Sequence, residues 1–177
     1  LEEEVSVMYE YASQLIANMK VGWNLGNTMD SEGKLETSWG NLKTTQEMID
    51  AVAAAGFNTI RIPTTWYCRA DAEGKIDKEW LERVAEVVDY CYANDMYVIL
   101  NTHHEGSWLV PDEGKIDKVE EKFLFFWKQI AEYFKEYDQH LVFEGLNEPR
   151  TIGSAKEWSG GTEKERELIN RLEKGFV

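Results

Sequence analysis

The residues best suited to chemistry in this 177-residue sequence gather just after four short apolar runs. They are Asn27, Arg61, His103, His104, Glu105, Asn147 and Glu148. Carboxyl and imidazole groups can transfer protons at a reacting centre, and an arginine binds a carboxylate through its planar fork. If the four runs are parallel strands, their carboxyl ends meet at one edge of a sheet. The sequence then predicts a single active site at that edge.

Two hydrophobic periods alternate along the chain and predict the elements that carry these groups. Short apolar runs, typical of strands buried on both faces, occupy residues 20–25, 57–62, 96–101 and 141–146. Apolar residues at helical spacing occupy residues 5–19, 48–55, 80–91, 123–134 and 168–172. Two of these helices are expected to begin at Thr-x-x-Glu capping boxes, at Thr44 and Thr162. Strands that alternate with helices predict a parallel sheet of four βα units after one leading helix.

Such a sheet can close into a (β/α)8 barrel or stay open. In a barrel, the carboxyl ends of the strands form the rim of the active site. An open, doubly wound sheet fits the same alternation, but the first strand-to-helix loop lacks G-x-G-x-x-G and the chain has no P-loop. Because loops are polar in most proteins, the rim groups could also be ordinary loop residues.

The formal net charge of −14 limits the classes of partner. So acidic a surface repels phosphate backbones, which excludes nucleic acid and suits a protein that acts on a neutral polymer. The sequence contains no run of 18 apolar residues, so we expect no membrane span and no membrane partner. It opens with Leu1-Glu2-Glu3-Glu4, so any signal peptide is expected to have been removed or never to have existed.

Metal and disulfide chemistry are both unexpected. Neighbouring residues on a strand point to opposite faces, so His103 and His104 should chelate one ion poorly. We therefore predict no metal and no cofactor. Cys68 should lie near the rim and Cys91 near the far end of the helix that follows, so the two should be too far apart for a disulfide.

Four stretches carry a more specific signal: Gly22–Thr28 (GWNLGNT), Gly56–Pro63 (GFNTIRIP), Tyr97–Glu105 (YVILNTHHE) and Phe143–Arg150 (FEGLNEPR). Together they resemble glycoside hydrolase family 5, and most closely the bacterial cellulases of its subfamily 4. The resemblance covers nearly the whole chain. It implies a TIM (β/α)8 barrel, of which residues 1–177 would be the N-terminal half of a single catalytic domain, a half-barrel of four βα units.

The resemblance also implies a role for each rim residue. Glu148 matches the acid/base, which protonates the leaving glycosidic oxygen and then deprotonates a water. Asn147 matches the residue that bonds the sugar 2-hydroxyl, and Arg61 the arginine that steadies the nucleophile's carboxylate. His103 matches a histidine near the cleaved sugar. Each could instead be structural, for example a surface carboxylate, a turn asparagine or an ion-paired arginine.

Three further positions resemble substrate contacts of the family: Asn27, His104 and Trp66, the last as a stacking platform. Trp66 could instead pack on a neighbour, and His104 could support the substrate contacts without touching the sugar. Glu144 shares its strand parity with Glu148 but lies below the rim. We therefore expect Glu144 to be a buried structural carboxylate.

A family 5 barrel carries its nucleophile, a second glutamate, at the end of the seventh strand, and this sequence ends after the fourth helix. The implied activity is hydrolysis of internal β-1,4-glucosidic bonds in β-glucans by a retaining mechanism, with the nucleophile absent from this chain. A xyloglucanase or a mannanase on the same scaffold is the alternative. The resemblance to secreted cellulases implies an extracellular protein.

Two hypotheses about the chain itself stay open. It could belong to a working endoglucanase, with a second chain completing the barrel. It could instead be a structural half-barrel that binds glucan without cleaving it. In either case the isolated chain should be inactive. Two copies paired around a two-fold axis should also be inactive. In such a pair the second Glu148 would stand at the position of the eighth strand, whereas the family's nucleophile belongs to the seventh.

Overall fold

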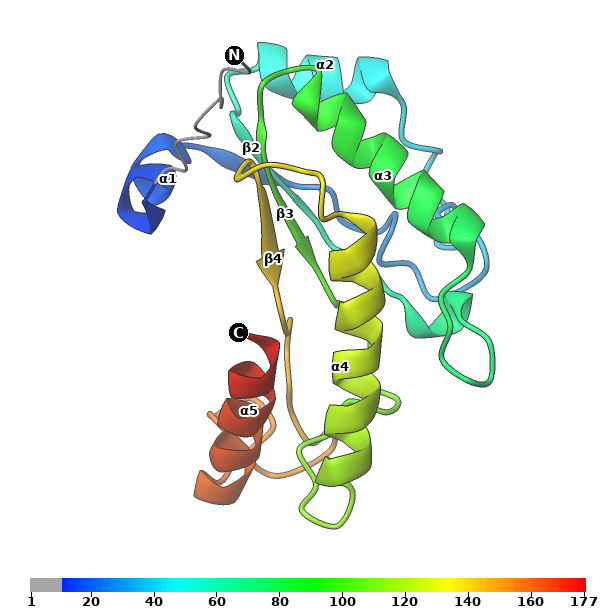
Figure 1. Ribbon diagram of the computed structural model, residues 1–177, viewed down its shortest axis with the longest axis vertical. Coiled ribbons are helices and arrows are strands. Elements are labelled where there is room, and N and C mark those ends of the chain that lie inside the picture. The colour runs from blue at the N-terminus through cyan, green and yellow to red at the C-terminus, as the bar shows by residue number, and fades with distance from the viewer. Residues whose placement is uncertain (1–10) are drawn as a thin grey trace, which may run out of the picture.

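The computed structural model describes residues 11–177 and contains one parallel sheet of four strands in the order β1-β2-β3-β4 (Figure 1). The strands are β1 (Gly22–Asn24), β2 (Thr59–Ile62), β3 (Tyr97–Asn101) and β4 (Leu141–Glu144). Each strand pairs with the strand that follows it in the chain. The predicted parallel sheet is therefore confirmed, with strands shorter than the apolar runs that predicted them.

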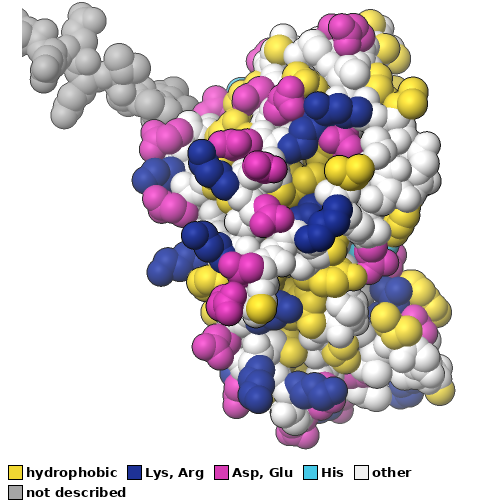
Figure 2. Space-filling view, turned by 90° about the vertical axis from the view of Figure 1, so that its right-hand side faces the viewer, with side chains coloured by type: hydrophobic (Ala, Val, Ile, Leu, Met, Phe, Trp, Pro, Cys, Tyr) yellow, Lys and Arg dark blue, Asp and Glu magenta, His cyan; other side chains and the backbone are white. Residues whose placement is uncertain are grey.

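Helices connect these strands and lie along the sheet. They are α1 (Ala12–Asn18), α2 (Gln46–Ala54), α3 (Lys78–Tyr92), α4 (Ile116–Tyr133) and α5 (Glu163–Phe176), with a 3-10 turn at Tyr67–Arg69. Helices α3 and α4 cover one face of the sheet, α2 lies against α3, and α5 lies against α4 (Figure 1). Figure 2 shows acidic and basic side chains interspersed on the outer face of the molecule, which turns to solvent. Within residues 11–177, no helix is long and apolar enough to cross a membrane.

The core lies between the sheet and the inner faces of α3 and α4. Helix α3 buries Val84, Val87, Val88 and Cys91 at helical spacing, and β3 in the middle of the sheet is buried at four of its five residues. Helix α4 adds aromatic volume at Phe123, Phe126 and Trp127. Full burial of such a side chain stabilises the fold by roughly 1.5–3 kcal/mol. This packing fixes the strands and hence the positions of their carboxyl ends.

One of the two predicted capping boxes is wrong. Helix α2 begins after Thr45, whose side chain accepts a hydrogen bond from the Met48 amide at 3.4 Å. Thr44 is buried, and its amide donates to the Glu36 carboxylate at 2.8 Å instead. A tertiary contact therefore overrides the local motif. The second box is confirmed, because Thr162 and Glu165 exchange hydrogen bonds at the start of α5.

The leading helix differs from its prediction in extent and in burial. Val5 and Met8 of the predicted stripe lie outside the described residues. In the described part, α1 has no buried residue, and Ile16 is 68% exposed. The apolar side chains that α1 carries at helical spacing are therefore not buried against a core within residues 11–177.

Cys68 and Cys91 are both free, as predicted. Cys91 is buried on α3, while Cys68 is partly exposed in the 3-10 turn after β2.

Candidate active site

Strand register brings an arginine and a glutamate together at the rim. Arg61 near the end of β2 forms a double hydrogen bond to Glu144 at the end of β4, with Nε–Oε2 and Nη2–Oε1 distances of 2.7 and 2.6 Å. Its Nη1 donates to the side-chain amide oxygen of Asn24, Oδ1, at 3.0 Å. Burial alone would raise the pKa of Glu144, but the hydrogen bonds from Arg61 and Asn101 outweigh burial and lower that pKa. Glu144 is therefore an ionised structural carboxylate, as predicted, but it lies at the end of β4 and is half-buried, so the prediction that it is buried below the rim is wrong.

Arg61 also orients Asn147. Its Nη2 donates to Oδ1 of Asn147 at 2.9 Å, so the amide oxygen faces the arginine and the NH2 group faces away from it. That NH2 group lies 3.4 Å from Nε2 of His103. The hydrogen bond to Glu144 raises the pKa of Arg61, which keeps the guanidinium charged. One arginine thus holds both Glu144 and Asn147.

The hydrogen bonds of Asn101 determine the tautomer of His103. The Thr64 amide can only donate, and it donates to Oδ1 of Asn101 at 3.0 Å. The Asn101 NH2 group therefore faces Glu144 at 3.0 Å and Nδ1 of His103 at 3.1 Å. Nδ1 accepts in this shorter contact, which places the proton of the neutral ring on Nε2, and the Asn147 NH2 group 3.4 Å from Nε2 then makes no hydrogen bond to the ring. Burial, aided by His104 and Arg61, lowers the pKa of His103 to about 4.

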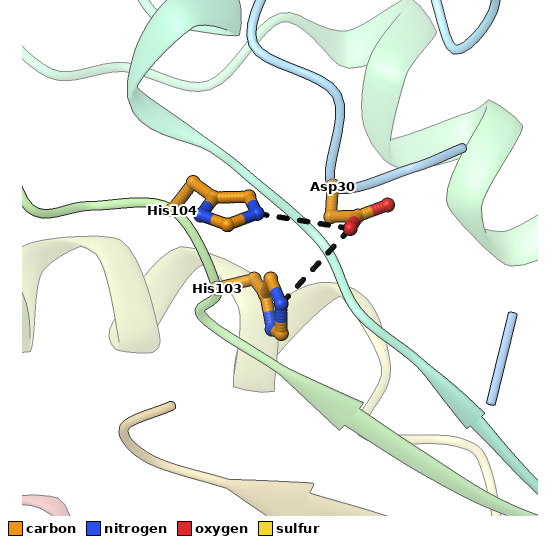
Figure 3. Close-up of side chains that lie close together, drawn as sticks. All are labelled: Asp30, His103 and His104. Atoms are coloured by element: carbon orange, nitrogen blue, oxygen red, sulfur yellow. Dashed lines mark ion pairs between the residues drawn. The ribbon is translucent and has the colours of Figure 1, made fainter. Parts of the chain in front are cut away.

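The two histidines converge on Asp30, a residue that the sequence reasoning did not select (Figure 3). Nε2 of His103 lies 4.0 Å, and Nε2 of His104 3.8 Å, from Oδ2 of Asp30. The expectation that the histidines point to opposite faces is wrong, because β3 ends at Asn101 and the chain bends at His104.

The three side chains Asp30, His103 and His104 have the geometry of a metal site but not the protonation. Their potential ligand atoms all lie within 4.8 Å of one another. However, Nε2 of His103 carries its proton, because Asn101 occupies Nδ1 as a donor. Ligation through Nε2 would move the ring proton to Nδ1, against the Asn101 NH2 group 3.1 Å away. These three side chains therefore do not suit a metal ion. The reason is the proton on Nε2 of His103, not the opposite orientation of the two histidines that the strand geometry predicted.

Glu148 lies four residues beyond the end of β4 and is exposed. Its Oε2 accepts a hydrogen bond from Nη1 of Arg150 at 2.9 Å. Glu148 lines a cavity of about 250 Å³ together with His103, His104 and Asn147, and we call this the rim cavity. The structure thus gathers four of the seven predicted site residues at one cavity, and Arg61 lies behind it.

Two of the predicted substrate contacts are placed differently. Trp66 is fully buried, and its indole N–H donates to the Asn101 carbonyl at 2.9 Å. A sugar ring cannot reach its face, so the prediction of a stacking platform is wrong. Asn27 is an exposed turn residue with a φ of 61° and does not line the rim cavity.

Glu105, the last of the polar residues noted after the apolar runs, is structural. It is 1% exposed, and its oxygens accept hydrogen bonds from the Trp66 amide at 2.7 Å and the Trp108 indole at 2.6 Å. Burial raises its pKa against the effect of these hydrogen bonds. Glu105 therefore ties the loop after β3 to the loop after β2.

Two exposed tryptophans near the cavity were missed. Trp39 is 43% exposed, and its ring centroid lies 5.2 Å from that of His104. Trp158 is 72% exposed, and the guanidinium of Arg150 lies 4.3 Å from its ring centroid. Both residues lie in loops, and exposure of a loop tryptophan cannot be read from sequence periodicity. Both have exposed ring surface, whereas Trp66 has none.

Comparison with known proteins agrees with this geometry. The family model described as Cellulase (glycosyl hydrolase family 5) matches residues 21–177. Endoglucanase A of Ruminococcus albus is 53% identical over 172 residues, which cover 94% of this chain and 47% of that protein. The chain spans a third to a half of the length of the first curated relatives that it matches.

Solved structures give the same result for the fold. A GH5-4 broad specificity endoglucanase from Clostridium longisporum superposes with a TM-score of 0.93 at 48% identity, covering 96% of this chain and 51% of that one. A xyloglucan-specific endo-β-1,4-glucanase from a metagenomic library, solved in complex with cellotriose, gives 0.89 at 50% identity and covers 93% and 51%. The four βα units are thus half of a (β/α)8 barrel, and this chain belongs to glycosyl hydrolase family 5.

Proposed function

We propose that residues 1–177 form the N-terminal half of a single catalytic domain that hydrolyses internal β-1,4 bonds of β-glucans, with Glu148 as acid/base. The observation that carries the proposal is the exposed Glu148 carboxyl beside Asn147 and His103 on one cavity. A glycosidase acid/base must reach both the leaving oxygen and a water, so it has to face solvent at the rim. Glu148 meets this requirement, whereas Glu105 and Glu144 are held by structural hydrogen bonds.

The neighbours of Glu148 support the proposal through the protons they can donate. Arg61 fixes the oxygen of Asn147, which leaves the NH2 group to donate to a sugar hydroxyl. His103 carries its proton on Nε2 and can donate to a second hydroxyl from the same cavity. A neutral, hydroxyl-bearing substrate satisfies both donors without adding charge to this site.

The nucleophile belongs to the part of the barrel that the chain does not include. Retaining hydrolysis needs two carboxyl groups about 5–5.5 Å apart, both able to reach the anomeric carbon. Within residues 11–177, Glu144 is engaged by Arg61 and Asn101, and Asp30 is 3% exposed and accepts from the Thr28 amide at 2.8 Å. We therefore expect the chain alone to be inactive.

Cellulose-like β-1,4-glucan is the proposed substrate and partner, and xyloglucan is the second candidate. Similarity to a xyloglucan-specific enzyme at 50% identity favours the second candidate over mannan. Trp39 and Trp158 offer platforms for sugar rings on either polymer. Because such polymers cannot enter a cell, we propose that the protein acts outside it.

The test is an assay on a completed barrel, made by joining this chain to the C-terminal half of the Ruminococcus albus relative. Glu148→Gln removes the proton donor and should lower kcat on carboxymethylcellulose roughly a hundredfold or more. Glu163→Gln, on exposed helix α5, is the matched control and should leave kcat unchanged. Xyloglucan and mannan are assayed in parallel to rank the substrates.

Two outcomes would contradict the proposal. Near-normal turnover of unactivated glucan by Glu148→Gln would reject its role. Activity of the 177-residue chain alone, above that of its own Glu148→Gln form, would reject the proposal that the chain lacks the nucleophile.

A further inference from the structure

A second cavity, of about 420 Å³, lies beside the first turn of α3 and shares no lining residue with the rim cavity. We call it the side cavity. Its wall includes Arg69, Trp80, Lys34 and Lys43. Arg83 also lines the cavity, which brings the number of cationic side chains to four. Arg83 is already paired with Glu36. Three acidic residues, Glu36, Asp77 and Glu79, line the same cavity.

Arg69 is a buried guanidinium without a carboxylate partner within residues 11–177. It is 2% exposed, and its hydrogen bonds go only to neutral acceptors: the Thr65 carbonyl at 3.1 Å, the Ser31 hydroxyl at 3.3 Å and the Cys68 sulfur at 3.4 Å. Its Nε is buried and has no hydrogen-bond partner. Buried charges are normally paired. Burial lowers the pKa of Arg69, and the nearby carboxylates of Glu36, Asp30 and Glu105 oppose this without hydrogen-bonding to it.

Trp80 offers a second unused donor at the same wall. The guanidinium carbon of Arg69 lies 3.7 Å from the Trp80 ring centroid, so the two groups stack. The indole side chain is 6% exposed, and its Nε1 is likewise buried without a partner. Both groups can only donate, so the missing partner is an acceptor.

We propose that the side cavity binds a small oxyanion, such as a phosphate or a carboxylate, through the Arg69 Nε–H, the Trp80 Nε1–H and the ammonium groups of Lys34 and Lys43. An oxyanion supplies the acceptor atoms that the two N–H groups lack, and it adds a direct ion pair to Arg69, on which Glu36, Asp30 and Glu105 act without a hydrogen bond. Asp77 and Glu79 also line the cavity, but both are exposed, so solvent screens their repulsion. A water molecule would satisfy the donors but would form no ion pair with Arg69.

The site lies directly behind the loop that carries Asp30. Arg69 donates to the hydroxyl of Ser31, the next residue, and to the carbonyl of Thr65. The Thr65 hydroxyl in turn donates to the Asp30 carbonyl at 2.8 Å and accepts from the His104 amide at 3.2 Å. An anion at Arg69 would therefore bind to the framework of the rim while leaving the rim cavity free.

The experiment follows the indole N–H signals of the full 177-residue chain by two-dimensional ¹H–¹⁵N NMR. The chain has 7 tryptophans, and the signal absent from Trp80→Phe identifies Trp80. Sodium phosphate and sodium glucuronate are titrated separately, each against sodium chloride at equal ionic strength. We expect a saturable shift of the Trp80 signal with at least one of the two oxyanions. Whether phosphate, glucuronate or both shift the signal then identifies the class of anion that binds.

Variants separate binding from general salt effects. Trp80→Phe keeps an aromatic ring beside Arg69 but removes the indole N–H, which should weaken binding measured by calorimetry about fivefold or more. Lys34→Gln and Lys43→Gln change side chains on the exposed surface, so they should fold normally and weaken binding severalfold when combined. Lys174→Gln on α5 is the matched control and should bind as the unchanged chain does.

Two results would overturn the proposal. One is a Trp80 signal that moves no more with phosphate or glucuronate than with chloride. The other is binding that survives Trp80→Phe and the double lysine variant unchanged. Neither result bears on Glu148, because the test needs no glucan and no hydrolysis.

Discussion

At the scale of single residues, the rim is organised by donors whose direction is fixed. The Thr64 amide orients Asn101, Asn101 determines the tautomer of His103, and Arg61 orients Asn147. The Thr64 amide and the Arg61 guanidinium can only donate, so they fix which end of each asparagine amide faces them, and Asn101 in turn fixes the tautomer of His103. The rim thereby presents N–H groups to the cavity before any ligand arrives, which lowers the entropy cost of binding.

His103 should make the fold sensitive to acid. Its pKa is about 4 in the folded chain and about 6.5 when unfolded, so protonation favours the unfolded state between these values. Its contribution is complete above pH 6.5 and is lost as pH falls toward 4. His103→Gln should therefore reduce the drop in the free energy of unfolding between pH 7.5 and pH 5 by about 2 kcal/mol. Urea unfolding at both pH values measures this, and equal drops in the two proteins would contradict it.

At the scale of elements, the start of α2 shows how a local motif and a tertiary contact compete. Glu36 accepts from the Thr44 amide and from Arg83 of α3, with an Arg83 Nε–Oε2 distance of 2.6 Å. Thr44 is therefore held by α3 and cannot cap α2, and the next residue caps it instead. The connection between two βα units thus shifts the helix start by one residue.

Substitution of the two threonines should separate these roles. Thr45→Ala removes the cap and should lower the free energy of unfolding by about 1 kcal/mol. Thr44→Val keeps the shape and removes a buried hydroxyl without a partner, so it should leave stability unchanged or raise it by up to about 1 kcal/mol. Thermal or urea unfolding of the two variants provides the comparison. The reverse order of stabilities would mean that Thr44 caps the helix.

The sequence predicted the parallel four-stranded sheet, the five helices (with α1 shorter than its predicted segment) and the rim positions of Arg61, His103, Asn147 and Glu148. These predictions succeeded because hydrophobic period and strand parity are local properties of the chain. The burial of Trp66 and the convergence of the histidines on Asp30 were missed. Both depend on how loops from different strands pack on one another, and no local pattern encodes that packing.

At the scale of the whole molecule, the sheet is closed on its helical face and open elsewhere. Strand β1 is exposed along its length, and β4 is only half-buried. Trp23 on β1 is 37% exposed, although it belongs to one of the four family motifs. These surfaces are where the rest of a barrel would pack, so the isolated chain should self-associate more readily than the completed barrel.

The two cysteines should react very differently with a thiol reagent. Burial raises the pKa of Cys91 to about 12, so its thiol should react only after unfolding. Cys68 is partly exposed and should react in the native chain. Titration should count one thiol before and two after addition of urea, and Cys68→Ser should abolish the native reaction. A native, unreduced monomer with no free thiol at all would mean that the two are bridged.

The strand order β1-β2-β3-β4 also bears on synthesis. Each strand pairs with the one made just before it, so a nascent chain leaving the ribosome always finds its partner already present. Pairings between consecutive βα units keep contact order low for a parallel sheet, which favours fast, vectorial folding. The growing edge moves from β1 to β4 as translation proceeds. At every stage one strand edge is therefore the template for the next, and that same edge is the place where a stalled chain would meet another copy.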